Sequence, residues 1–277
     1  MNYFGCSLRE LFASHNNFIR SCSKLAYKMY MKPILSQIKN NAKEPGKTVE
    51  SSGYVKGQVE GAKWVCKKSS YYGQVKDLIN DPDSFINEGK IIKDEAGHTI
   101  VSVDIEGKEV IIKRYNVKNF WHRLKRAFKS SRANNYWIAC HWLQAVGVDT
   151  IEPIGIIEKY RYGLKTETYF LSYRAKGERL EQFIQGPDPL IANRIVSIFR
   201  RMGWINFSHG DAKTGNFLLE NGYLKVFDLD KAKAGQWDFI FKRKIADDYQ
   251  RMLKGWEHLP AMQDMLKRRL SALKRRI

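Results

Sequence analysis

Alternation of apolar and polar residues in the first two thirds of the chain predicts a small antiparallel sheet. In one run Val101, Val103 and Ile105 alternate with polar residues, as expected of a strand with one buried face. Turn residues such as Glu106-Gly107 separate this run from the next one. Three to five strands are expected, at Gly89–Lys93, Thr99–Ile105, Lys108–Tyr115, Ile154–Glu158 and Thr168–Tyr173.

Apolar residues at a spacing of three or four predict helices in other parts of the chain. One of them begins with Asp188 as its cap and Pro189 in its first turn, and Gly203 closes it. The last helix carries an apolar stripe from Leu259 to Ile277, and Lys and Arg cover its remaining surface. Three more helices are expected, at residues 18–38, at Phe120–Val146 and around Leu180–Ile184.

Strands followed by helices indicate an α+β fold with two lobes. We expect a small antiparallel-sheet N-terminal lobe over residues 54–173 and a reduced helical C-terminal lobe over residues 174–277, which ends in the basic helix. Residues 1–53 would form a basic extension with a linker, because Asn40–Gly53 is rich in Lys, Asn, Gly and Ser. A nucleotide would bind between such lobes, near Tyr173–Ala175.

Composition places the chain among folded proteins with an anionic partner. The 277 residues are 43% hydrophobic, with 14 Tyr, 14 Phe and 7 Trp, which argues against disorder. The formal net charge of +19 requires nucleic acid, a lipid surface or an acidic substrate nearby, and charge alone does not choose among them. A stripe of Arg20, Lys24, Lys28 and Lys32 fits either a helix lying on a membrane or a solvated helix packed on the body.

The expected location is inside the cell. The four cysteines lack C-x-x-C spacing and a nearby His pair, so reduced thiols fit better than disulfides or structural zinc. No run approaches the ~18 apolar residues of a membrane span, and the start of the chain lacks a secretory signal.

The segment His209–Asp230, HGDAKTGNFLLENGYLKVFDLD, carries the strongest chemical signal. Asn221-Gly222 between two short apolar runs predicts a tight hairpin. One loop and this hairpin would therefore gather a carboxylate, an ammonium, a carboxamide and a second carboxylate, which phosphoryl transfer requires. A polar turn on a surface hairpin explains any one of these residues but not four at this spacing: Asp211, Lys213, Asn216 and Asp228.

These residues resemble the protein-kinase-like superfamily, and within it the bacterial lipopolysaccharide-core kinases, which phosphorylate heptose or Kdo sugars. Further similar stretches are VIIKRYN at 110–116, RAF-x-x-SRA-x-x-x-W at 126–137 and GVDTIEPIG at 147–155. The resemblance implies ATP and Mg²⁺ as cofactors. It also implies that Asp211 orients or deprotonates the acceptor hydroxyl, that Lys213 contacts the moving phosphate, and that Asn216 and Asp228 bind the metal.

The nucleotide-binding part departs from the protein-kinase pattern. The resemblance implies that Lys113 contacts the nucleotide phosphates, but no Asp or Glu occurs from Val110 to Val148, and Tyr136 stands where some members have Glu. Lys113 must then be oriented by Asp228, by the nucleotide or by another acid such as Glu88. The glycine-rich loop is missing, so that only Gly89 and Gly97 lie near the hairpin, and Asp230 replaces the glycine of DFG.

The expected function is ATP-dependent phosphorylation of a sugar hydroxyl on a lipid-linked, anionic glycan. The basic surface would hold the enzyme peripherally on acidic lipids at the cytoplasmic face of the inner membrane. A nucleic-acid-associated basic protein is an alternative, although no zinc, RNP or helix-turn-helix signature supports it and nucleic acid is not the expected partner. A small atypical protein kinase is a third possibility, disfavoured because only about fifty residues follow the metal-binding motif.

Overall fold

The computed structural model describes residues 49–51, 53–59, 61–95, 97–116, 130–183 and 185–274. The chain divides into two compact units. The sheet unit comprises the described residues up to Ile138 together with Ile151–Ala175, and the helical unit comprises Ala139–Thr150 and the described residues from Lys176 onward. The expectations for residues 18–38 with their basic stripe, and for residues 117–129, lie outside the described part of the chain.

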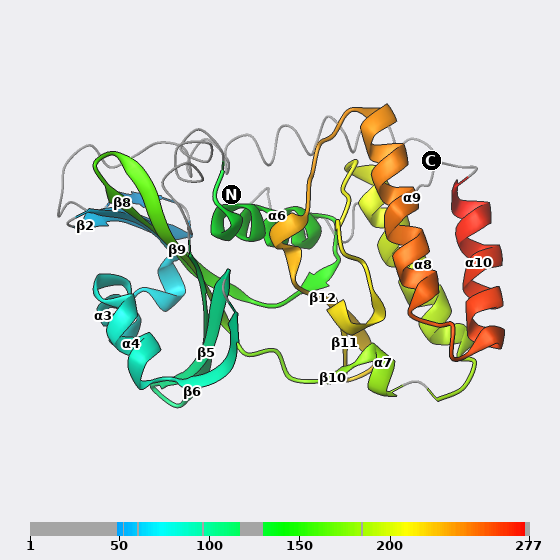
Figure 1. Ribbon diagram of the computed structural model, residues 1–277, viewed down its shortest axis with the longest axis horizontal. Helices are drawn as coiled ribbons and strands as arrows, with labels where there is room; N and C mark the ends of the chain where they lie inside the picture. The colour runs from blue at the N-terminus through cyan, green and yellow to red at the C-terminus, as the bar shows by residue number, and fades with distance from the viewer. Residues whose placement is uncertain are drawn as a thin grey trace, which may run out of the picture. The chain divides into compact units, whose positions relative to one another are not determined.

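The sheet unit contains one antiparallel sheet of eight strands in the order β1-β2-β3-β8-β9-β6-β5-β4 (Figure 1). The five expected strands are present, but the estimate of three to five was too low, because β1, β2 and β3 add three more. Strands β2 and β3 were missed because glycines and lysines in segment 54–67 interrupt the alternation of apolar and polar residues. Strand β1 was missed because it lies in the segment that was predicted to be a linker. The strands are β1 Val49–Ser51, β2 Tyr54–Val59, β3 Ala62–Lys67, β4 Lys90–Glu95, β5 His98–Ile105, β6 Lys108–Tyr115, β8 Pro153–Arg161 and β9 Leu164–Tyr173.

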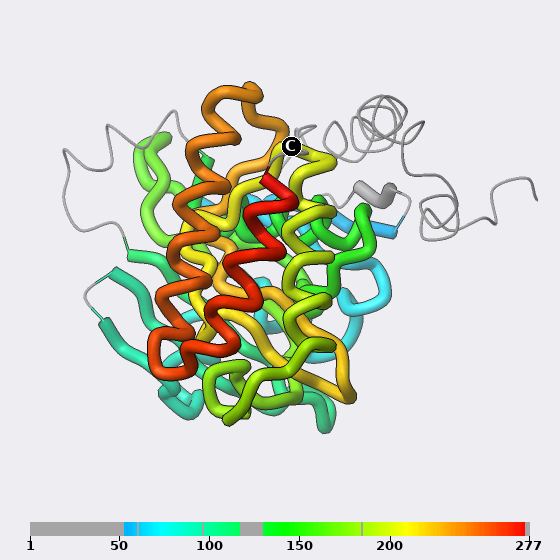
Figure 2. The backbone as a smooth tube through the Cα atoms, turned by 90° about the vertical axis from the view of Figure 1, so that its right-hand side faces the viewer, coloured from blue at the N-terminus to red at the C-terminus, as the bar shows by residue number. Residues whose placement is uncertain are grey.

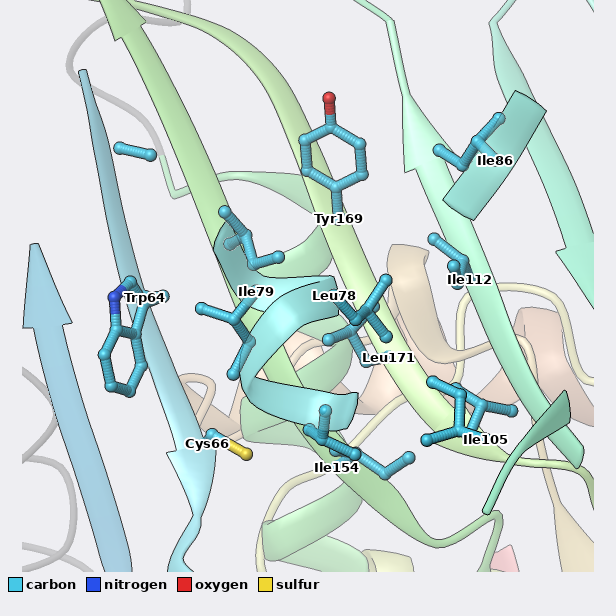
Figure 3. Packing of buried hydrophobic residues seen from close by; sticks show 14 of the residues in the cluster. Trp64, Cys66, Leu78, Ile79, Ile86, Ile105, Ile112, Ile154, Tyr169 and Leu171 are labelled. Atoms are coloured by element: carbon cyan, nitrogen blue, oxygen red, sulfur yellow. The ribbon is translucent and has the colours of Figure 1, made fainter. Parts of the chain in front are cut away.

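Two short helices that the sequence pattern did not predict cover one face of this sheet: α3 Gln74–Asn80 and α4 Pro82–Glu88. Leu78 and Ile79 of α3 lie over the buried side chains of the central strands (Figure 3). Cys66 belongs to the same core, and burial raises the pKa of its thiol to about 12. A turn of 3-10 helix, η1 Lys68–Ser70, precedes α3.

Helices dominate the second unit. The division between the units falls within α6 Arg132–Ala145, and the expected helices are confirmed as α7, α8 and α10. Asp188 caps α8 by accepting hydrogen bonds from the amides of Leu190 (2.8 Å) and Ile191 (3.0 Å). The helix α9, which lies beside α10 (Figure 2), was not predicted. The bounds are α7 Leu180–Phe183, α8 Pro189–Trp204, α9 Asp238–Lys254 and α10 Pro260–Lys274.

A small four-stranded sheet completes the helical unit, in the order β10-β11-β12-β7. Its strands are β7 Asp149–Thr150, β10 Glu178–Arg179, β11 Phe217–Glu220 and β12 Tyr223–Val226, with the 3-10 turns η2 Thr214–Asn216 and η3 Leu229–Lys231 on either side of the hairpin. The predicted α+β class, an antiparallel-sheet unit and a helical unit, is confirmed. None of the described helices is long and apolar enough to cross a lipid bilayer.

Candidate active site

The hairpin predicted from Asn221-Gly222 forms in the helical unit. Strand β11 pairs with β12, and Glu220 lies opposite Tyr223, so the loop contains two residues. Both have positive φ, 50° at Asn221 and 77° at Gly222, as a type I′ turn requires. The hairpin thereby brings the residue after β12 back to the residue before β11: the amide of Phe227 donates to the carbonyl of Asn216 at 3.1 Å.

Gly210 fixes the path of the loop that precedes the hairpin. Its φ of +80° disfavours any residue with a Cβ, and a Cβ built there would lie 2.8 Å from the carbonyl oxygen of Lys231. The sequence HGD therefore needs glycine at its centre for two reasons. The close approach also brings η3, which contains Lys231, next to the loop that carries Asp211.

A buried carboxylate on α9 forms hydrogen bonds with the backbone of the same loop. Asp248 is fully buried and accepts hydrogen bonds from the amides of His209 (2.7 Å) and Gly210 (3.0 Å), and also from the guanidinium of Arg251 (3.3 Å). Burial raises the pKa of the Asp248 carboxyl, and these donors oppose that shift. One side chain thus satisfies two consecutive backbone donors immediately before Asp211.

The imidazole of His209 ties the two halves of the motif together. It is fully buried and lies against the ring of Phe217, with 6.1 Å between centroids. Its Nδ1 accepts from the Asp211 amide at 3.3 Å, so Nε2 carries the proton and donates to the carbonyl of Phe227 at 3.1 Å. Burial lowers the pKa of His209, which keeps the ring neutral. The negative charges of Asp248, Asp228 and Asp211 oppose that lowering of the pKa without overcoming it.

Asp211 and Asn216 are joined directly. The Asn216 amide nitrogen Nδ2 donates to the main-chain carbonyl of Asp211 at 2.7 Å, which turns the other amide atom, Oδ1, away from that carbonyl. The Asp211 side chain is 23% exposed, and its Oδ2 accepts from Nζ of Lys231 at 3.2 Å. Lys213 is exposed two residues further on. The loop thus presents one accessible carboxylate with two lysines in its vicinity.

Asp228 adopts the left-handed conformation, with φ 59° and ψ 51°. Such backbone geometry is uncommon for a residue with a side chain, and it tends to occur at functional sites. Asp228 is partly exposed at the end of β12, whereas Asp230 is buried within η3. The Phe227 amide is hydrogen-bonded to the carbonyl of Asn216 at the point where the hairpin meets the loop. Asp228 is the next residue after this junction.

The donor set suits a magnesium ion that is also bound by phosphates. Among the described residues no three His, Cys, Asp or Glu side chains form a group that could hold a metal by themselves. Mg²⁺ does not need such a cage, because it keeps waters and commonly takes one or two protein oxygens plus substrate phosphates. Asn216 Oδ1 and the Asp228 carboxylate provide two oxygens of the required type.

The predicted nucleotide-binding residues lie in the sheet unit. Lys113 on β6 is buried with its ammonium over two aromatic rings, 5.4 Å from the centroid of Tyr115 and 5.5 Å from that of Tyr136 on α6. Gly89 follows α4, where a Cβ would meet the carbonyl oxygen of Phe85 at 2.9 Å, so close contact within the fold itself accounts for a glycine there. Gly97 lies in the turn between β4 and β5, with nothing within 4 Å of a Cβ built on it.

Two residues of the site were missed in the sequence. Asp248 could have been found, because it occupies a position on the apolar face of α9 between Ile245 and Met252, where a carboxylate needs a buried partner. Lys231 gave no such signal, since a lysine three residues after Asp228 is ordinary on a surface. Its contact with Asp211 follows from the close approach at Gly210.

Comparison with known proteins gives matches among solved structures. No protein-family model and no curated protein matches the chain. The chain is similar to WaaP in complex with acyl carrier protein (18% identity, 73% of this chain and 94% of that one, TM-score 0.48). It is also similar to Rio2 kinase from Chaetomium thermophilum (15% identity, 71% and 66%, 0.48) and to aminoglycoside phosphotransferase APH(4)-Ia (11% identity, 74% and 83%, 0.45). Two of these three proteins are a kinase and a phosphotransferase by name.

Proposed function

We propose that this protein is an ATP- and Mg²⁺-dependent phosphotransferase that acts on a sugar hydroxyl of the lipopolysaccharide inner core, on heptose or Kdo. The observation that carries the proposal is the convergence of Asp211, Asn216 and Asp228. One loop and one hairpin hold them, and Asp248 and His209 anchor both from the interior. A surface turn would not need this many buried polar contacts.

Asp211 would take the role of base. Its partly exposed carboxylate would orient the acceptor hydroxyl and take the proton as that oxygen attacks the γ-phosphorus, while the bond to the β-γ bridging oxygen breaks and ADP leaves. Negative charge on the moving phosphoryl group requires cations: Lys231 contacts the carboxylate, and Lys213 follows Asp211 by two residues and is exposed. Lys231 also keeps Asp211 in place through its contact at 3.2 Å.

Asn216 Oδ1 and Asp228 would hold Mg²⁺ together with the nucleotide phosphates. The metal supplies charge neutralisation for the β- and γ-oxygens. Lys113 stays a proposed contact of the nucleotide phosphates, and its ammonium lies over the rings of Tyr115 and Tyr136. Gly89 and Gly97 stay proposed nucleotide contacts.

The basic character of the chain supports an anionic acceptor. With a net charge of +19, the protein favours phosphorylated or carboxylated core sugars and acidic phospholipids over neutral sugars. In α10 the outward-facing residues include Lys267, Arg268 and Lys274, as expected for a helix near an anionic surface. We therefore propose a lipid-linked glycan as substrate, met at the cytoplasmic face of the inner membrane.

Phosphate incorporation from labelled ATP tests this function. The full chain is incubated with Mg²⁺ and core lipopolysaccharide, and Asp211→Asn is compared with Asp247→Asn, an exposed acid on α9 of the same unit. We expect incorporation by the wild type and by Asp247→Asn, and a loss of at least 100-fold in Asp211→Asn, in the range typical of a removed general base. Equal rates in both variants would refute the assignment of Asp211.

Parallel reactions separate the alternatives. Faster labelling of the protein itself or of a protein partner than of the glycan would indicate an atypical protein kinase. If labelling is absent and the chain binds duplex or single-stranded nucleic acid with a steep salt dependence, a nucleic-acid-associated protein replaces the kinase.

A further inference from the structure

Three large apolar side chains are exposed together at the start of α9. Trp237 is 76%, Phe239 74% and Ile240 37% exposed, and Lys242, Arg243 and Lys244 directly follow them on the helix surface. We call these six residues the α9 patch. Single exposed apolar residues are common, but three within four residues beside a basic run mark an interaction surface.

The α9 patch is outward-facing because the inner face of the helix is already occupied. Phe241 and Ile245 are buried and point into the helical unit, together with Asp248. With 3.6 residues per turn, Phe239 and Arg243 lie on the side opposite this buried face, and Ile240 and Lys242 lie at its two flanks. The fold therefore holds Phe239 and Ile240 in water next to a well-packed face, instead of burying them.

We propose that the α9 patch docks on a bilayer containing anionic phospholipid, with the aromatic side chains at headgroup depth and the lysines and arginine on the phosphates. Trp is the side chain most typical of the membrane–water interface, and nearby basic residues add attraction to anionic lipid. This inference rests on the proposed function in one respect: a lipid-linked acceptor gives the docking its purpose.

Charge favours a bilayer over other partners. Residues 231–246 contain five basic residues and one acid, Asp238. That acid is engaged by the fold, because Nδ2 of Asn206 donates to its carboxylate at 2.6 Å. A second copy of this chain would bring the same positive charge to the contact. An anionic bilayer complements both the apolar and the basic part of the patch.

The α9 patch is braced to the catalytic loop. Asn206 donates to the carbonyl of Gln236 at 2.9 Å, and Gln236 donates to the hydroxyl of Ser208 at 2.8 Å. Ser208 also forms a backbone bridge with Lys233 and directly precedes His209. The loop that ends in Trp237 is thus tied to the start of the HGD motif, so a surface bound by the patch has a fixed relation to Asp211.

The end of α10 adds charge on the same side. The N-terminal end of α9 and the C-terminal end of α10 lie at the same end of the helical unit (Figures 1 and 2). Lys274 is exposed at that end of α10. The docking surface would therefore extend from the α9 patch toward Lys274.

Vesicle co-sedimentation with the full chain tests the proposal. Vesicles of phosphatidylcholine alone are compared with vesicles that also contain phosphatidylglycerol. The double variant Trp237→Ala/Phe239→Ala removes apolar contact, and Lys242→Gln/Arg243→Gln/Lys244→Gln removes charge. The matched control is Tyr72→Ala/Tyr162→Ala in the sheet unit, where both rings are also exposed, 61% and 90%.

We expect both α9 patch variants to bind the phosphatidylglycerol vesicles at least tenfold more weakly than the wild type, and the control to bind as the wild type does. Of the two patch variants, only the charge variant should bind vesicles to an extent that no longer depends on the salt concentration. Circular dichroism confirms that each variant is folded. Equal binding by wild type and patch variants overturns the proposal, as does a dimer in light scattering that the patch variants convert to monomer.

Binding needs neither ATP nor acceptor, so this test is independent of the kinase assignment. If the patch variants lose vesicle binding but phosphorylate a detergent-dispersed acceptor at the wild-type rate, both proposals stand. If the wild type binds vesicles through the patch but transfers no phosphate, the docking surface stands and the proposed function fails.

Discussion

Removing the Asp248 carboxylate should loosen the catalytic loop more than any other single change on α9. In Asp248→Ala the amides of His209 and Gly210 lose their acceptor, and the first of them is fully buried. An unsatisfied buried donor costs about 1–3 kcal/mol. Two such donors, together with the lost contact to Arg251, give a destabilisation of about 3–5 kcal/mol, a large part of the ~5–15 kcal/mol that stabilises a typical domain.

Asp248→Asn should destabilise the protein much less than Asp248→Ala does, for a geometric reason. Oδ2 of Asp248 lies 2.7 Å from the His209 amide and 3.2 Å from the Gly210 amide, so a single amide oxygen at that position can accept from both. The NH₂ group would then occupy the Oδ1 position, where the contact with Arg251 and the 3.0 Å bond from the Gly210 amide are lost. We expect a loss of about 1–2 kcal/mol for Asp248→Asn.

Urea unfolding and amide hydrogen exchange measure these losses. Asp247→Ala is the matched control, since the neighbouring acid is exposed on the same helix. At about 1.4 kcal/mol per tenfold, a local loss of 3 kcal/mol corresponds to exchange of the His209 and Gly210 amides faster by more than 100-fold. The reasoning is refuted if Asp248→Ala costs no more than Asp247→Ala and the two amides keep their protection.

Three further predictions concern the same machinery. Tyr136→Leu should weaken binding of an ATP analogue about tenfold in calorimetry, since a largely buried cation–π contact is worth ~1–2 kcal/mol, while Tyr136→Phe should bind normally; equal loss in both would exclude the ring as the cause. Burial lowers the pKa of His209, so the unfolded chain binds the proton first, and stability should fall as pH drops below about 6.5, by up to 1.36 kcal/mol per unit. In urea unfolding at a series of pH values, the free energy of unfolding should depend less on pH in His209→Gln than in the wild type. An equal pH dependence in both proteins would contradict this role of His209. Asp228→Gly should be about 1 kcal/mol more stable than Asp228→Ala, because both lack the carboxylate but only alanine strains at φ 59°, and neither should transfer phosphate.

The hairpin of the site was predictable because its signals are local. Asn221-Gly222 allows two consecutive positive φ angles, and the apolar residues on each side set the register. The cap at Asp188 and the stripe of α10 are local in the same sense, and both are confirmed. A reader of the sequence needs only a few neighbouring residues to find each of them.

The missed elements depend on partners far away in the chain. Strand β3 is buried because α3 and β8 cover it, and its own run, AKWVCK, has no clear period of two. Helix α9 combines buried Phe241 with exposed Trp237 and Phe239, so the start of its apolar pattern is obscured by residues that the fold leaves in water. The contact of Asp248 with His209 spans 39 residues. No local rule encodes such a pairing.

The buried half and the accessible half of the catalytic loop have opposite tasks. His209 and Asp248 are fully buried and hydrogen-bonded, and together they fix the backbone from which Asp211 and Asn216 project. The Asp211 carboxylate remains partly in water, held by one lysine contact that an incoming hydroxyl and phosphate can replace. Strain at Asp228 persists because the surrounding hydrogen bonds at Phe227 determine the backbone path. Phosphoryl transfer requires such a rigid backbone support under a partly exposed carboxylate, because catalysis depends on positioning and charge, with little covalent chemistry by the protein.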